Sequence, residues 1–263
     1  MTTKPQPLVP ALRFDGVTVE VLDGRHRRTV VDAFTLEVYA GELVAVMGPS
    51  GSGKSTVVNV GCGLVTPTRG EVAVLGARPG PLVSLSPRWW AERRRSCVGV
   101  VHQRLNLLGG LSARENVALA LDLQGRTHAE ARREADAALE RVGISSLANI
   151  VTDRLSVGEQ QRVAIARAIA GDRPIVLADE PSAALDRTSA DEVSRLLADL
   201  AHDGRAVLLV THDSQQASWA DRTLVVRDGR IVDHISAHPT AGSPTDLPQP
   251  GHDSTPLPSA GWS

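Results

Sequence analysis

Short apolar runs and amphipathic stretches alternate along most of this chain. The apolar runs are rich in β-branched side chains, and Gly, Pro or polar residues bound each of them, which is typical of buried strands. The runs that predict strands are Leu43–Met47, Val98–Val101, Ile175–Ala178, Ala206–Val210 and Leu224–Val226. Because helical stretches separate these runs, the pattern predicts an α/β fold with a largely parallel sheet covered by helices.

Several predicted helices begin with a capping box, in which Ser or Thr is followed three residues later by Glu. The pairs are Ser112 with Glu115, Thr127 with Glu130, Ser156 with Glu159, and Ser189 with Glu192. From about Ser112 to Ala170 the pattern is helical throughout. We therefore expect a helical subdomain, at about 104–170, inserted into the α/β core.

The two ends of the chain differ from this middle part. Leu12–Val21 and Val30–Val38 have the pattern of strands joined by a polar hairpin tip, which predicts an N-terminal antiparallel β-subdomain. Residues 236–263 contain six prolines and neither Lys nor Arg, a composition that predicts a disordered tail. The expected organisation is an extension (1–11), one domain (12–235) and this tail.

The composition suits a globular protein and argues against several other classes. The 28 basic and 30 acidic residues give a net charge of −2, so nothing indicates a nucleic-acid partner. No apolar run approaches the ~18–20 residues of a membrane span, and the first residues lack the pattern of a signal peptide. Cys62 and Cys97 are too few for a disulfide framework, which favours a reducing compartment. We expect any membrane role to come through a partner.

The strongest chemical signal is a loop between the predicted strand Leu43–Met47 and an apolar helix, Thr56–Cys62. It fits the phosphate-binding pattern G-x-x-x-x-G-K-[ST], and its residues are Gly48, Pro49, Ser50, Gly51, Ser52, Gly53, Lys54 and Ser55. Glycines allow backbone N–H groups to surround phosphate oxygens, and the helix start attracts the same anion. We expect this loop and Thr56 to bind a nucleotide, with Lys54 on the β- and γ-phosphates and Ser55 on Mg²⁺.

A second chemical signal is a pair of carboxylates, Asp179 and Glu180, at the end of the predicted strand Ile175–Ala178. In α/β sheets, ligands bind at the carboxyl ends of the strands. We expect Asp179 to hold Mg²⁺ through water, and Glu180 to polarise the water that attacks the γ-phosphate. An acidic strand end before Pro181 also fits a helix cap, but the phosphate-binding loop upstream favours the catalytic interpretation.

The segment Leu155-Ser156-Val157-Gly158-Glu159 resembles the LSGGQ or LSGGE signature of the ATP-binding cassette (ABC) ATPases. The resemblance covers roughly residues 12 to 235 and implies a P-loop NTPase (RecA-like) core with a mixed sheet. It further implies a homodimer in which Ser156, Val157, Gly158 and Glu159 of one chain act on the nucleotide held by the other. Val157 replaces a glycine of the signature, and Ser156 and Gly158 are retained.

Further motifs of the family occur in the family's order. Gln103 matches the Q-loop, which implies a contact with nucleotide-bound Mg²⁺ and coupling to a membrane partner. Asp186 matches the D-loop at the dimer interface, and His212 matches the switch histidine that contacts the γ-phosphate. Glu180 and His212 are thus the expected catalytic residues. Val21 stands where the family places an aromatic side chain on adenine, which predicts weaker or less base-selective nucleotide binding.

Within the ABC ATPases, three segments are similar to the macrolide-exporter and lipoprotein-release group (MacB/LolD-like, with FtsE nearby): Val101–Leu108, Leu111–Val117 and Leu177–Pro181. The resemblance implies a cytoplasmic ATPase subunit held at the inner face of the cell membrane by integral membrane permease subunits. Two functions stay open. The ATPase powers export or extraction of an amphipathic or peptide-like substrate, or it signals through a permease-like partner to a cell-wall hydrolase without transport.

Overall fold

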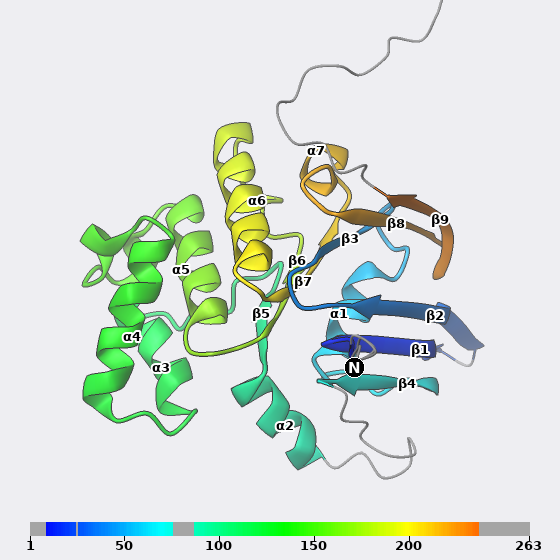
Figure 1. Ribbon diagram of the computed structural model, residues 1–263, viewed down its shortest axis with the longest axis horizontal. Helices are drawn as coiled ribbons and strands as arrows, with labels where there is room; N and C mark the ends of the chain where they lie inside the picture. The colour runs from blue at the N-terminus through cyan, green and yellow to red at the C-terminus, as the bar shows by residue number, and fades with distance from the viewer. Residues whose placement is uncertain (1–8, 25, 76–86, 237–263) are drawn as a thin grey trace, which may run out of the picture.

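The computed structural model describes residues 9–24, 26–75 and 87–236. Its centre is a six-stranded sheet in the order β5-β6-β7-β3-β8-β9 (Figure 1). Five strands, β3, β5, β6, β7 and β8, run parallel to one another, and β9 is antiparallel to β8 at one edge. The strands are β3 (Leu43–Met47), β5 (Val98–Val101), β6 (Ile175–Asp179), β7 (Ala206–Thr211), β8 (Arg222–Arg227) and β9 (Arg230–Ser236). The five predicted strands therefore lie next to one another, and the predicted mixed sheet is confirmed.

A separate antiparallel sheet has the order β2-β1-β4. Its strands are β1 (Leu12–Asp23), β2 (His26–Val38) and β4 (Arg69–Val74). The predicted hairpin is confirmed, and pairing continues to Asp23 opposite His26. The sequence pattern did not predict β4 or β9. Both lie at sheet edges and carry charged residues, so that their strand conformation depends on pairing with β1 and β8 rather than on their own apolar pattern.

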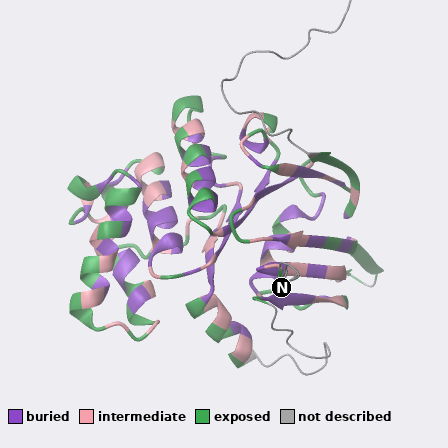
Figure 2. Cartoon of the chain, in the orientation of Figure 1, coloured by how far each residue is buried: buried purple, intermediate pink, exposed green. Residues whose placement is uncertain are grey.

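Both faces of the six-stranded sheet are buried, as expected for parallel strands. Successive side chains of a strand point to opposite faces, and β6 shows the result. Val176 and Ala178 belong to a core shared with the helices α3 to α6, whereas Ile175 and Leu177 belong to a core shared with α1 and the antiparallel sheet. Figure 2 shows these central strands as the most continuously buried part of the chain. The carboxyl end of the sheet is thereby fixed between two cores.

The helices cover both faces of this sheet. They are α1 (Lys54–Gly61), α2 (Pro87–Ser96), α3 (Ala113–Asp122), α4 (His128–Arg141), α5 (Val157–Ile169), α6 (Arg187–His202) and α7 (Ser214–Ala217). Helices α3, α4 and α5 form the inserted helical part, at one side of the molecule (Figure 1). The 3₁₀ turns Ser145–Leu147 and Thr152–Arg154 lie between α4 and α5. The inserted helical region is thus confirmed.

Three of the four predicted capping boxes are present, at the starts of α3, α4 and α5. The fourth prediction was wrong. Helix α6 begins one turn earlier, with Asp186 as its N-cap, and Ser189 N donates to Asp186 Oδ1 at 3.0 Å. Asp caps a helix as well as Ser does, so that an aspartate three residues before a serine competes for the same helix start.

Helix α2 carries two adjacent tryptophans, whose rings meet edge to face at 4.9 Å between centroids. Trp90 is buried in the core beneath the antiparallel sheet, and Arg93 lies over the half-buried Trp89 ring. In the described ranges, no helix has the length and apolar character needed to cross a bilayer. Residues 1–8 of the predicted extension and residues 237–263 of the predicted tail lie outside the described residues.

Candidate nucleotide-binding site

The phosphate-binding loop joins the end of β3 to the start of α1, and neighbouring backbone presses closely on its glycines. A Cβ added to Gly48 would lie 2.1 Å from the carbonyl oxygen of Val226. Gly53 has φ +96°, and a Cβ there would lie 2.4 Å from the carbonyl oxygen of Val30. The two glycines are therefore required by backbone contacts with β8 and β2. The sequence motif identified the loop but not Val30 or Val226.

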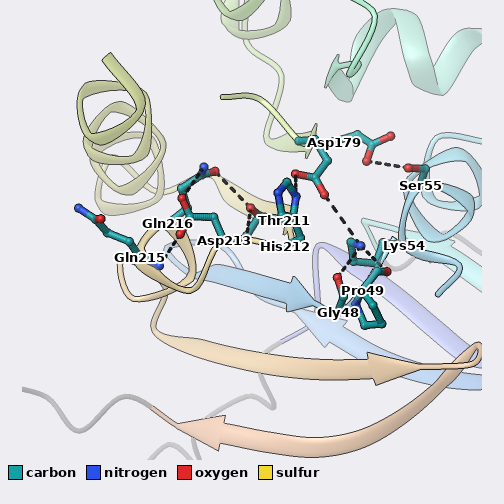
Figure 3. A network of polar contacts seen from close by, with 11 residues as sticks. Gly48, Pro49, Lys54, Ser55, Asp179, Thr211, His212, Asp213, Gln215 and Gln216 are labelled. Atoms are coloured by element: carbon teal, nitrogen blue, oxygen red, sulfur yellow. Dashed lines mark hydrogen bonds and ion pairs between the residues drawn. The ribbon is translucent and has the colours of Figure 1, made fainter. Parts of the chain in front are cut away.

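The only lysine in the described part of the chain, Lys54, is 6% exposed and lies across the loop that precedes it. Its Nζ donates to the carbonyl oxygens of Gly48 at 2.7 Å and Pro49 at 3.0 Å (Figure 3). The same Nζ lies 3.9 Å from Oε1 of Glu180, whose side chain is also largely buried. The loop thus holds one positive charge that is only partly balanced and that faces the end of β6.

The hydroxyl of Ser55 donates to Asp179 Oδ1 at 3.0 Å (Figure 3). Asp179 is buried, and within the described ranges it forms no ion pair. Burial raises the pKa of Asp179, and the nearby Glu180 charge adds to this effect, while the Ser55 hydrogen bond and Lys54 oppose it. A buried carboxylate beside a serine hydroxyl provides the oxygen ligands that Mg²⁺ prefers. The residues present therefore fit a magnesium ion.

Glu180 is the first residue beyond β6, and its backbone has φ +49°, which is unusual for a residue with a side chain. Its N–H donates to Val210 O of β7 at 2.9 Å, which fixes this turn. Nδ1 of His212, the residue after β7, lies 2.8 Å from Glu180 Oε2. The neighbouring parallel strands β6 and β7 thus bring the two predicted catalytic residues into direct contact.

A small polar network holds the backbone around His212. Thr211 Oγ1 accepts a hydrogen bond from Asp213 N at 3.0 Å and donates to Gln216 Oε1 at 3.3 Å. Asp213 also caps the short helix α7, since its Oδ1 accepts from Gln215 N at 2.8 Å (Figure 3). His212 itself remains more than half exposed, with its ring directed at Glu180.

A cleft of about 300 Å³ lies over the loop, and its lining combines residues from four parts of the chain. The lining residues are Val30, Ser50, Gly51, Gly53, Lys54, Ser55, Thr56, Gln103 and Glu180. Gln103 follows β5 and reaches this cleft from an exposed segment. Val21, the predicted adenine neighbour, is 42% exposed on β1 and lies outside the lining. Val30, on β2, is part of the lining.

The signature residues form a second surface. Ser156 is the exposed N-cap of α5, and Val157 is 52% exposed. A Cβ on Gly158 would lie 3.6 Å from Leu185 Cδ2, so that the signature adjoins the predicted D-loop. The contacts described for residues 156–159 stay within the helical region and Leu185 and do not reach the phosphate-binding loop. Asp186, the predicted interface residue, is exposed and caps α6.

The ABC transporter family profile matches residues 31–183, which include the phosphate-binding loop, the signature and Glu180. This chain belongs to the ABC transporter family. It is 40% identical over 243 residues to the macrolide export ATP-binding/permease protein MacB 2 of Yersinia pestis bv. Antiqua, covering 90% of this chain and 35% of that protein. A MacB 2 of Aeromonas hydrophila is 37% identical over 93% of this chain and 38% of its own length. The chain thus spans about a third of these relatives.

Solved ABC cassettes have the same fold. The dimeric structure of MJ0796, described as a bacterial ABC transporter cassette, superimposes with a TM-score of 0.80 at 36% identity, covering 86% of this chain and 98% of that one. CbiO1 of Clostridium perfringens, described as part of an ABC transporter complex, gives a TM-score of 0.75 at 25% identity over 86% and 88% of the two chains. The chain is therefore an ABC ATPase cassette, as the sequence motifs predicted.

The loop glycines provide a matched pair of substitutions. Gly51 has φ +81° with open space where a Cβ would lie, whereas Gly53 also meets Val30 O. We expect Gly51→Ala to lower the free energy of unfolding by about 1 kcal/mol through backbone strain alone. Gly53→Ala should cost roughly 1–3 kcal/mol more because β2 must shift. Chemical denaturation of both variants tests this order, and equal losses would contradict the Val30 contact.

The raised pKa of Asp179 predicts that its charge destabilises the nucleotide-free protein. Asp179→Asn keeps an oxygen acceptor for Ser55 and removes the charge, so that the thermal midpoint at pH 7.5 should rise. The gain should shrink as the pH falls through the raised pKa, because wild-type Asp179 then becomes neutral. Thermal melts across pH, with Asp23→Asn as an exposed control, provide the measurement, and an unchanged or lower midpoint would refute the prediction.

Proposed function

We propose that this cassette binds ATP with Mg²⁺ in the cleft over Lys54 and hydrolyses it to drive a separate membrane permease, for export or extraction of an amphipathic or peptide-like substrate. The convergence of Lys54, Asp179, Glu180 and His212 at the ends of three adjacent strands carries this proposal. The MacB relatives are named macrolide export ATP-binding/permease proteins, which supports the direction of transport.

In the proposed reaction, Lys54 exchanges its bonds to the Gly48 and Pro49 carbonyls for bonds to the β- and γ-phosphates. The loop N–H groups and the start of α1 add partial positive charge at the same place. Ser55, Asp179 and Gln103 would hold Mg²⁺ there, with Asp179 acting through water. The metal ion, when bound, neutralises charge on the phosphate oxygens.

Glu180 is the proposed general base. Its Oε1 lies near Lys54 and its Oε2 contacts His212, so that two neighbours orient the carboxylate over the cleft. In this position it accepts a proton from the water that attacks the γ-phosphate. His212 orients Glu180 and lies exposed at the site, where it can also contact the γ-phosphate.

We further propose that two copies of the chain pair head to tail around ATP. The loop surrounds only one side of a bound nucleotide. The exposed Ser156 and the half-buried Gly158 at the start of α5 provide hydrogen-bond donors for the opposite side. Asp186, next to the signature through Leu185, would lie at the same interface. The dimeric form of the similar cassette MJ0796 supports this arrangement.

The permease contact is proposed at the junction of the sheet and the helical region, close to Gln103. A cleft of about 330 Å³ there is lined by Arg94, His102, Arg167 and Arg173 among others. Arg167 on α5 donates to the carbonyl oxygens of Leu105 and Asn106, both at 2.7 Å. These bonds join the helical region to the segment after Gln103, so that a partner bound here would respond to the state of the nucleotide cleft.

Loss of the proposed base should stop turnover while ATP binding remains. We expect Glu180→Gln to lower the ATPase rate by about 10²–10⁴-fold, the usual contribution of a general base, and to accumulate ATP-bound dimers. Phosphate release and sedimentation velocity provide the measurements. Glu140→Gln on the exposed surface of α4 is the control and should leave both unchanged. Full ATPase activity in Glu180→Gln would disprove the assignment.

The ATP-bound Glu180→Gln protein should also capture its membrane partner. In a pull-down from native membranes, we expect a permease with few membrane spans and a large external domain. The same pull-down with ADP should recover less of it. The proteins that bind the permease externally would then distinguish an exporter from a system that signals to a cell-wall hydrolase. Recovery of soluble proteins alone would argue against the transport role.

The position of Val21 predicts weak base discrimination. We expect ATP and GTP to bind with similar affinity, and Val21→Tyr to tighten ATP binding about tenfold, since stacking on a base contributes ~1–3 kcal/mol. Leu22→Tyr is the matched control, because adjacent strand residues face opposite sides. Equilibrium titrations with labelled ATP and GTP measure both. A strong ATP preference in the wild type, unaffected by Val21→Tyr, would contradict the placement of adenine.

A further inference from the structure

At the start of helix α5, the hydroxyl group of an exposed serine is already hydrogen-bonded to a carboxylate. Oε2 of Glu159 accepts hydrogen bonds from Ser156 Oγ and from Ser156 N, both at 2.8 Å. Ser156 Oγ in turn accepts a hydrogen bond from Glu159 N at 3.3 Å. A serine hydroxyl has a single proton to donate, and in this arrangement that proton is committed to Glu159.

The charge of Glu159 has no positive partner in the part of the chain that the structure describes. Arg162, three residues further along α5, forms an ion pair with Glu192 and donates to Val142 O at 2.9 Å. The hydrogen bonds from Ser156 hold the pKa of Glu159 below its usual range. The start of α5 therefore presents an ionised carboxylate beside the hydroxyl of Ser156.

The same arrangement occurs twice more in the helical region, at Ser112 with Glu115 on α3 and at Thr127 with Glu130 on α4. The distances match closely: the carboxylate oxygen lies 2.7 Å from each hydroxyl oxygen. These two boxes stabilise helix starts that carry no signature residues. They therefore show what an ordinary capping glutamate does, and they serve as internal controls for Glu159.

We propose that Glu159 restrains the ATP-dependent association of two copies of this chain. The inference rests on the proposed function, in which Ser156 and Gly158 face the γ-phosphate held by the other copy. For Ser156 to donate its proton to that phosphate, its hydrogen bond to Glu159 must break. The freed carboxylate then lies beside another negative group, and like charges at this distance repel each other.

Both effects raise the ATP concentration at which the dimer forms. Glu159 is thus a positioning residue that acts through Ser156, and its charge sets the threshold for closure. A glutamine at this position still caps the helix, because its amide oxygen accepts the same bonds. It carries no charge and releases the serine proton more readily, since hydrogen bonds to neutral acceptors are weaker.

The test measures dimer formation against ATP concentration by sedimentation velocity, using the full chain with Glu180→Gln so that hydrolysis does not consume the dimer. We expect Glu159→Gln to lower the half-maximal ATP concentration about tenfold through the removed repulsion. Glu115→Gln and Glu130→Gln should leave it unchanged. Glu159→Asp, which keeps the charge, should not lower it. Thermal melts of every variant confirm folding and report any loss of capping stability.

The outcomes are distinct. A lowered ATP threshold in Glu159→Gln alone supports the proposal. An unchanged threshold in a protein that still dimerises with ATP overturns the role of Glu159 and leaves the proposed function in place, as does an equal shift in all three glutamine variants. Failure of the Glu180→Gln parent to dimerise at any ATP concentration overturns both the proposed function and this inference.

Discussion

The backbone carbonyls of Val30 and Val226 lie so close to Gly53 and Gly48 that neither glycine has room for a side chain. This close approach joins the phosphate-binding loop to the antiparallel sheet and to β8. The turn after β8 adds to it, because Gly229 N donates to Ser52 O at 3.1 Å and Gly229 O accepts from Asp32 N at 2.8 Å. The loop is therefore held in shape by its contacts with neighbouring strands and by the turn after β8.

The electrostatics of the cleft follow from this rigid loop. Lys54 is buried and bonded to carbonyl oxygens, and Asp179 is a buried carboxylate whose pKa is raised. Neither charge is fully compensated by the residues that the structure describes. Such local costs are expected at functional sites, where the surrounding structure supplies the stability. A ligand that brings both phosphate oxygens and a cation would satisfy Lys54 and Asp179 together.

Helices α3, α4 and α5 begin with the same type of capping box, but the surroundings of the three boxes differ. The capping boxes of α3, α4 and α5 have nearly identical geometry. Among these three helices, only α5 begins with an exposed serine and has a glycine that adjoins Leu185 of the D-loop. The capping glutamates of α3 and α4 stabilise their helix starts. In the proposed dimer, the corresponding glutamate of α5 faces the nucleotide held by the other copy. The function of such a residue depends on what approaches the helix, and therefore on the assembly.

The sequence by itself determined the local features that depend on neighbouring residues: the buried strands, the loop pattern ending in Lys54, the carboxylates after Ile175–Ala178, and three helix starts. It did not determine β4 and β9, whose strand form depends on pairing, or the start of α6, where Asp186 and Ser189 compete as caps. Only the tertiary structure decided that Glu180 contacts His212, since the parallel pairing of β6 and β7 brings residues 32 positions apart to one sheet end. The tertiary structure also decided that Val30 lines the cleft, because the residue pattern does not show which strand lies beside the phosphate-binding loop.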